Sequence, residues 1–162
     1  MIKIIENFLP EQDFLNLQNF LLDEKIPWFY RDTIVLKDDP PYFTFCFYNN
    51  DRIQSPAFDL VQPLLNKLNY SSIIQIRANL VLKEESEKRV GWHTDYSYKN
   101  FKTAIYYINN TNGPTVVKGD KNVKVYPKKN KILIMDGSTE HAAIIQTDKK
   151  RRIVLNINYY EK

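Results

Sequence analysis

Three side chains in this sequence are of types that bind a metal together: the two histidines of the chain, His93 and His141, and Asp95, which follows the first of them by two positions. Two imidazoles and one carboxylate are the facial ligand set of non-haem Fe(II), which leaves three coordination positions open. The chain has no third histidine and a single cysteine, so it offers no competing Cys/His zinc site. The pattern therefore predicts an iron site made by His93, Asp95 and His141.

A basic residue follows the second histidine at the start of a strand-like run, 152–159. In an extended chain, alternate residues share a face, so Arg152, Asn156 and Asn158 lie on one face and the isoleucines and leucine between them on the other. The polar face suits a ligand cavity, and the apolar face suits packing beneath a helix layer. Arg152, but not Arg151, is thus predicted to bind the far carboxylate of a dicarboxylic acid that chelates the metal.

The 162 residues are enough for one domain with a sizeable core and too few for two, so we expect a single domain over residues 1–162. Hydrophobic residues make up 43% and aromatic residues 14% of the chain, as is typical of a folded globule. A single cysteine excludes an intramolecular disulfide and fits a reducing compartment. No apolar run approaches the ~20 residues of a membrane span, and no signal peptide is recognisable, which favours a cytoplasmic protein.

The net charge of +4 could indicate binding to nucleic acid or to an acidic partner. Lysines gather between Lys118 and Lys131, where they alternate with glycine, aspartate, asparagine and proline. These are turn-forming residues. We therefore interpret the lysine cluster as a solvated hairpin.

The elements that would carry the site divide into a helical front and a strand-rich back. One helix is expected to begin at Pro10, and a second at Ser55-Pro56 with a kink or break at Pro63. Short strands and a turn are expected within 28–48. Further strands with period-two alternation are expected at 74–80, 103–108, 115–117, 123–126, 131–135 and 152–159. This order predicts an α+β protein in which a β-sandwich or barrel carries the site.

These residues resemble the prolyl-hydroxylase type of 2-oxoglutarate/Fe(II)-dependent dioxygenases, particularly small bacterial and phage members. The run 73–159 is similar to their double-stranded β-helix core, a jelly-roll or cupin-like fold with N-terminal helices packed on the major sheet, and 5–10 is similar to their opening. The resemblance implies Fe(II), 2-oxoglutarate and O2 as cofactor and cosubstrates. It also implies hydroxylation of a C–H bond with release of succinate and CO2, in the cytoplasm of a bacterium or a phage-infected host.

The resemblance also implies roles for residues beyond the metal ligands. Tyr107 matches a tyrosine that hydrogen-bonds the distal carboxylate of 2-oxoglutarate, and alternation places Thr103 on the same strand face. Asn79 lies on a strand that often lends polar groups to the cosubstrate. We accordingly predict Arg152, Tyr107, Thr103 and Asn79 as cosubstrate-binding residues. The sequence departs from many relatives at Val81, where they carry a tyrosine.

Other functions remain open on the sequence alone. A cupin-like protein could hold zinc or manganese with the same three ligands and ignore 2-oxoglutarate, and an inactive barrel could bind acidic partners through its lysines. Nucleic-acid demethylases of the same superfamily carry a second arginine six positions after the first, where this chain has Asn158. We therefore expect a peptide, protein or small-molecule substrate, with a prolyl side chain among the candidates, and we disfavour nucleic acid.

Overall fold

A computed structural model describes residues 2–162, in which helical segments come early and strands dominate the rest. The helical segments are α1 (Glu11–Leu22), the 3-10 helix η1 (Pro56–Val61) and α2 (Gln62–Lys67). The strands are β1 (Ile2–Ile5), β2 (Phe29–Arg31), β3 (Tyr42–Asn49), β4 (Arg52–Ile53), β5 (Tyr70–Leu82), β6 (Lys102–Tyr107), β7 (Thr115–Val117), β8 (Val123–Val125), β9 (Lys131–Asp136), β10 (His141–Ala143) and β11 (Arg151–Glu161). Within residues 2–162, no helix has the length and apolar character needed to cross a lipid bilayer.

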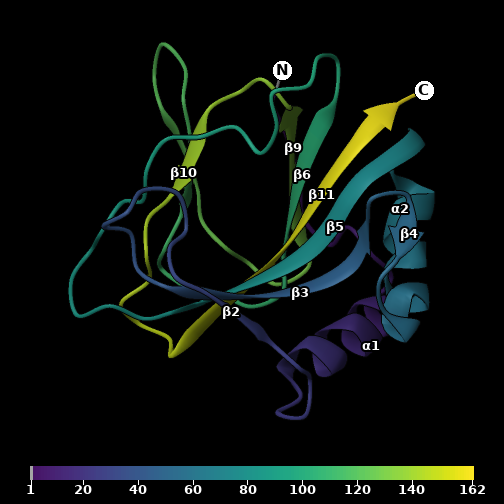
Figure 1. Cartoon of the computed structure of the whole chain (residues 1–162), viewed down its shortest axis with the longest axis horizontal. Helices are drawn as coiled ribbons and strands as arrows, with labels where there is room; N and C mark the ends of the chain where they lie inside the picture. Colours follow the sequence, from purple (N-terminus) through teal and green to yellow (C-terminus); the bar gives the residue numbers. More distant parts are fainter. Residues whose placement is uncertain (1) are drawn as a thin grey trace.

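The strands form two antiparallel sheets. The large sheet has eight strands in the order β1-β9-β6-β11-β5-β3-β2, with β4 paired to β3. The small sheet has the order β10-β7-β8. Figure 1 shows the helices on one side of the large sheet and β10 on the other side. The chain is therefore α+β, with its N-terminal helices packed on the major sheet, as predicted.

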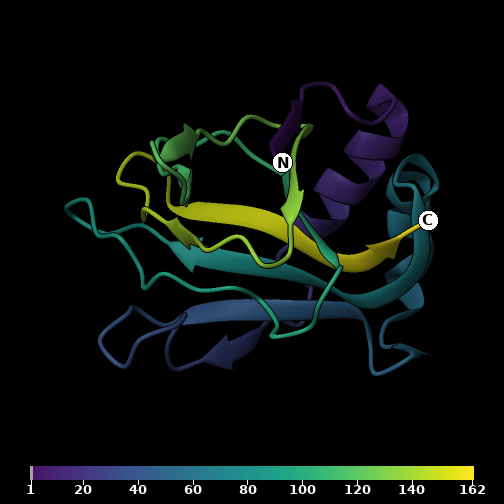
Figure 2. The ribbon, with the colours of Figure 1, turned by 90° about the horizontal axis from the view of Figure 1, so that it is seen from above.

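Strand β11 lies at the centre of the large sheet between β5 and β6, and Figure 2 shows β11 and β5 side by side along the molecule. In this register Arg152 pairs with Val81, and Asn156 pairs with Arg77. Because residues two apart share a face, Arg152, Asn156 and Arg77 all lie on the face of the sheet that lines the cavities described below.

The opposite face of the large sheet packs against the helices and forms the main hydrophobic core. Ile153, Leu155 and Ile157 of β11 belong to this core and are completely buried. Burying an aliphatic side chain of this size stabilises the fold by about 1.5–3 kcal/mol. The alternation predicted for this strand, with its polar residues on one face and its apolar residues on the other, is confirmed.

The helical segments begin and break where the sequence predicted. Helix α1 buries Phe14, Leu17 and Leu21 against the sheet. The Ser55 hydroxyl caps η1 by accepting a hydrogen bond from the backbone N–H two residues on, at 3.1 Å. Pro63 lies in the first turn of α2. The proline therefore separates two short helical pieces, one of the two outcomes expected of it.

The sequence did not predict strands β1, β4 and β10, and it predicted only short strands in the region of β3. Strand β1 pairs with β9, although its side chains Ile2 and Ile4 remain 37% and 46% exposed at the sheet edge. Four residues at an edge carry too little alternation to indicate a strand. Strand β3, in a region where short strands were expected, has eight residues because it pairs with the long strand β5 through most of its length.

Candidate metal and carboxylate site

The two histidines face each other across a reciprocal pair of backbone hydrogen bonds. The His93 N–H donates to the His141 carbonyl at 3.1 Å, and the His141 N–H donates to the His93 carbonyl at 2.9 Å. His141 begins β10 of the small sheet, while His93 lies in the segment that follows β5. Their ring centroids are 4.4 Å apart. The backbone thus fixes the distance between two imidazoles that are far apart in sequence.

Asp95 completes a group that we call the His–Asp–His cluster. One carboxylate oxygen of Asp95, Oδ1, lies 3.8 Å from Nε2 of His93 and 3.9 Å from Nε2 of His141. The ligand atoms of all three side chains lie within 4.8 Å of one another. The other oxygen, Oδ2, is buried and has no hydrogen-bond partner in residues 2–162. A divalent cation bound between the three side chains would neutralise this buried carboxylate, so the donor set fits a metal.

The outer nitrogens of both imidazoles face carbonyl groups, which sets the tautomer. Nδ1 of His93 lies 3.2 Å from the Gly91 carbonyl oxygen, and Nδ1 of His141 lies 3.4 Å from the Thr139 carbonyl oxygen. A carbonyl only accepts, so each Nδ1 carries the proton and each Nε2 lone pair is directed toward Asp95. Burial lowers the pKa of His141, although the Asp95 carboxylate acts in the opposite sense. A neutral imidazole is the form that binds a metal.

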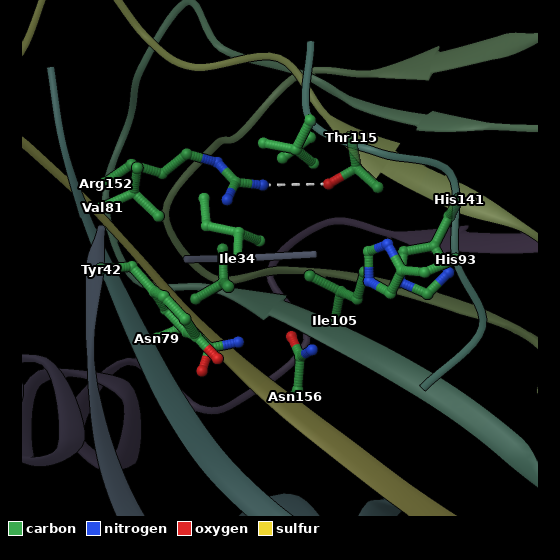
Figure 3. Close-up of a pocket in the computed structure, with 13 residues that line it drawn as sticks. Ile34, Tyr42, Asn79, Val81, His93, Ile105, Thr115, His141, Arg152 and Asn156 are labelled. Carbon is green, nitrogen blue, oxygen red and sulfur yellow. Dashed lines mark hydrogen bonds between the residues drawn. The ribbon is translucent and has the colours of Figure 1, made fainter. Parts of the chain in front are cut away.

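A cavity of about 60 Å³ runs from the two histidines to Arg152, and Figure 3 shows these groups at its opposite ends. We call it the Arg152 cavity. It is lined by Ile34, Tyr42, Asn79, Val81, Val90, His93, Ile105, Thr115, His141, Ala143, Arg152, Val154 and Asn156. Aliphatic side chains form much of its wall, and Asn79 and Asn156 add polar groups between the two ends.

The Arg152 guanidinium is a buried cation without a buried anion. The residue is 4% exposed, and its Nη2 donates to the Thr115 hydroxyl at 3.0 Å. Its Nε has no acceptor, and none of the carboxylates in residues 2–162 forms an ion pair with it. Burial lowers the pKa of Arg152 because it disfavours the charged form. An incoming carboxylate would relieve this penalty.

Tyr107 lies beside Arg152 and shares its hydrogen-bond partner. The Tyr107 hydroxyl donates to Thr115 Oγ1 at 2.9 Å, and the Arg152 guanidinium carbon lies 6.0 Å from the Tyr107 ring centroid. Burial raises the pKa of Tyr107, so its hydroxyl remains protonated and able to donate. Thr115 accepts from both groups and was not predicted from the sequence. It belongs to β7 of the small sheet, and the hydrogen bond from Arg152 places it next to β11.

The two remaining predicted cosubstrate residues lie in different surroundings. Asn79 lines the Arg152 cavity, and its Oδ1 is buried without a partner among residues 2–162. Thr103 is 1% exposed, donates to Asn158 Oδ1 at 2.8 Å, and is absent from the lining of this cavity. The structure thus brings Asn79, but not Thr103, to the cavity that adjoins the His–Asp–His cluster. The roles assigned to both residues stay predictions.

Sequence reasoning missed most of the apolar wall. Ile34 and Tyr42 belong to the irregular aromatic segment before and at the start of β3, and nothing in their local pattern points to a cavity. Ile105 and Val154 could have been found, because alternation places them on the same strand faces as Tyr107 and Arg152.

A second cavity, of about 330 Å³, lies next to the Arg152 cavity and has five lining residues in common with it. We call it the Arg77 cavity. It is lined by Arg77, Asp95, Val35 and Thr94, and it shares with the Arg152 cavity the residues Ile34, Tyr42, Asn79, His93 and Asn156. The cluster therefore adjoins two spaces, each of which contains one arginine.

Comparison with solved structures identifies the fold. An oxidoreductase of the 2OG-Fe(II) oxygenase family from Burkholderia pseudomallei is 13% identical, with a TM-score of 0.73 over 98% of this chain and 84% of that one. A prolyl-4-hydroxylase from Pseudomonas putida is 14% identical, with a TM-score of 0.67 over 99% and 92%. HygX from Streptomyces hygroscopicus, solved with nickel and 2-oxoglutarate bound, is 10% identical, with a TM-score of 0.67 over 99% and 83%. The chain therefore has the double-stranded β-helix fold of 2-oxoglutarate/Fe(II) oxygenases, as predicted.

Sequence comparisons give less information about the family than the structural comparisons do. No family model matches the chain. An uncharacterized protein from Borreliella burgdorferi is 30% identical in a 126-residue alignment that covers 74% of this chain and 32% of that protein. The chain spans about a third of the length of this relative.

Proposed function

We propose that this chain is an Fe(II)- and 2-oxoglutarate-dependent oxygenase. In this proposal it hydroxylates a C–H bond of a peptidyl side chain, such as a prolyl residue, or of a small metabolite, and it releases succinate and CO2. The observation that carries the proposal is the Arg152 cavity, which holds a buried unpaired guanidinium at one end and the two histidines at the other. A dicarboxylate that also chelates a metal matches both ends.

The residues present fit each group of the proposed complex. His93, Asp95 and His141 would hold Fe(II). Arg152 would bind the C5 carboxylate of 2-oxoglutarate through charge-assisted hydrogen bonds, which are stronger than neutral ones. Thr115, which accepts from both Arg152 and Tyr107, would keep the guanidinium directed along the cavity.

When bound, the iron supplies the redox chemistry that couples decarboxylation of 2-oxoglutarate by O2 to hydroxylation of the substrate. The protein supplies positioning and exclusion of water. Ile34, Ile105 and Val154 form an apolar wall between the cluster and Arg152. Such a wall lowers the local dielectric constant and strengthens the contact between guanidinium and carboxylate.

The direct test is release of succinate from 2-oxoglutarate by the purified protein, with and without Fe(II) and O2. The proposal predicts slow succinate release that requires both, even without a substrate. Binding of zinc or manganese with no succinate under any of these conditions would favour the cupin-like alternative instead.

The substrate class is the less constrained part of the proposal. Two observations support a peptide or small molecule: the fold is shared with a prolyl-4-hydroxylase, and the Arg77 cavity beside the cluster is of a size for one side chain or a small molecule. A panel of proline-containing peptides and free amino acids should contain a member that accelerates succinate release and gains one oxygen atom. Stimulation by methylated oligonucleotides alone would contradict this substrate class.

A further inference from the structure

Arg77 is a second cation on the cavity face of the large sheet. It lies on β5, where it pairs with Asn156 of β11 and Cys46 of β3, and it lines the Arg77 cavity together with Asp95 and His93. Its side chain is half-buried, and its Nε is fully buried without an acceptor. None of the hydrogen bonds or ion pairs found within residues 2–162 uses the Arg77 guanidinium.

The groups around Arg77 do not neutralise it. The Asp95 Oδ2 atom is itself unpaired, so this carboxylate, although it lines the same cavity, forms no ion pair with Arg77. Cys46 lies within electrostatic range of Arg77, yet burial raises the pKa of its thiol and keeps it neutral. Once a metal engages Asp95, the positive charge of Arg77 has no counterpart in its cavity.

The two cavity arginines are held apart by the strand register. Arg152 pairs with Val81, and Arg77 lies four residues before Val81 on the same strand. Four residues of an antiparallel strand span roughly 14 Å. His93 lines both cavities, so the His–Asp–His cluster lies next to both of them. The two cavities share five lining residues, so a cosubstrate at Arg152 and a second molecule at Arg77 would lie side by side next to the cluster.

We propose that Arg77 binds a carboxylate of the substrate, so that the molecule hydroxylated is an acid or an acidic peptide and lies in the Arg77 cavity with its reacting C–H bond toward the cluster. This inference rests on the proposed function, because the bound acid is a substrate only if the protein is an oxygenase. Binding of a carboxylate at Arg77 does not depend on turnover, and it can be measured separately. An unpaired half-buried guanidinium in a cavity of about 330 Å³ gains a charge-assisted pair from such a ligand.

The binding test observes the Nε–Hε resonance of Arg77 by NMR, assigned with an Arg77→Lys variant. The protein is used metal-free and with Zn(II) and 2-oxoglutarate. The probes are acetate, N-acetylglycine and N-acetyl-L-proline, each compared with its amide. The inference predicts that the acids shift the Arg77 resonance, that the amides shift it at least tenfold less at equal concentration, and that 2-oxoglutarate shifts the Arg152 resonance instead. If none of the three acids moves the Arg77 resonance, the inference is overturned.

The turnover test compares matched acid and amide substrates by succinate release. The free-acid arm uses N-acetyl-L-proline and its amide, and the peptide arm uses capped Pro-Asp and Pro-Asn dipeptides. The acids should stimulate at least tenfold more than their neutral partners in one arm, and that arm identifies the source of the carboxylate. Arg77→Gln should remove this preference.

Arg31→Gln is the matched control. Arg31 is exposed on β2, bonds to Thr44 at 3.4 Å, and lines neither cavity. The control should retain the preference for acids. Equal loss in both variants would show a general effect of positive charge, and equal stimulation by acids and amides would show no recognition; either result overturns the inference. A wild type that releases no succinate contradicts the proposed function, while the NMR result still decides whether Arg77 binds a carboxylate.

Discussion

The two faces of the large sheet differ in whether their buried polar side chains find hydrogen-bond partners within the protein. On the helix-covered face, the side chain of Asn130 accepts from the Leu9 N–H at 2.8 Å and from the Tyr106 hydroxyl at 2.7 Å, and donates to the Leu9 carbonyl at 2.9 Å. On the cavity face, buried atoms of Arg152, Asn79 and Asp95 have no partner within residues 2–162. Buried polar groups are nearly always hydrogen-bonded in folded proteins.

This difference indicates that one face serves mainly stability and the other mainly binding. Polar groups on the helix-covered face are complete within the protein and contribute to stability. On the cavity face, Thr103 and Asn158 also pair with each other, but the unpaired atoms near the cluster are completed by something else, which we propose to be the metal and the cosubstrate. Mutations on the first face should therefore change the free energy of unfolding, whereas mutations on the second should change binding.

The largest expected effect is at a metal ligand. His141→Ala removes one of three ligands on the cavity face and should abolish Fe(II)-dependent succinate release, measured by chromatography of the reaction mixture. The variant should remain folded by circular dichroism, because His141 is not part of the main core. Iron binding and turnover equal to the wild type would contradict the assignment of the cluster.

The next largest effect concerns Arg152 and its neighbour. Arg152→Gln should weaken 2-oxoglutarate binding by roughly 2–5 kcal/mol, the usual loss when one partner of a buried charge pair is removed. Calorimetry of the Fe(II) protein without O2 measures this. The matched control is Arg151→Gln, because Arg151 lies on the other face and donates to the Leu22 carbonyl at 3.0 Å. A stronger effect at Arg151 would mean that the cosubstrate binds on the helix-covered face of β11, which would contradict the assignment of Arg152.

A smaller effect, and on stability, is expected on the helix-covered face. Asn130→Gly removes the side-chain amide but tolerates the backbone φ of 62° at this position. Buried groups left unpaired cost about 1–3 kcal/mol each, so we expect the free energy of unfolding to fall by roughly 2–4 kcal/mol. Urea unfolding measures the loss, and the affinity for 2-oxoglutarate should not change. A variant as stable as the wild type, but impaired in binding, would reverse the roles of the two faces.

The sequence predicted the parts of this comparison that follow from alternation. Arg152 and Ile153 were assigned to opposite faces because β11 is a regular strand with both neighbours in place, and the structure confirms this facing. Thr115 could not be found in this way, because its place opposite Arg152 depends on how the small sheet folds over the large one. Alternation along 74–80 puts Arg77 on the same strand face as Asn79, but nothing in the sequence indicates that a cavity lies above it.

The smallest expected effect is next to a metal ligand but outside the cavities. Glu140 precedes His141 and forms a surface ion pair with Lys118, with both side chains more than 40% exposed. Exposed pairs contribute about 0–1 kcal/mol, so Glu140→Gln should change the unfolding midpoint little. Succinate release should be unchanged as well. A large loss of activity would show that the active region extends beyond the two cavities.

The central claim is that metal and 2-oxoglutarate complete the cavity face. Its most direct test is thermal unfolding of the Fe(II) protein without O2, with and without 2-oxoglutarate. A ligand at 100 times its dissociation constant stabilises the folded state by about 2.7 kcal/mol. For a chain of this size that corresponds to a rise of roughly 5–10 °C in the unfolding midpoint. We expect this rise in the wild type and its absence in Arg152→Gln; an unchanged midpoint in the wild type, or an equal rise in both proteins, would contradict the account.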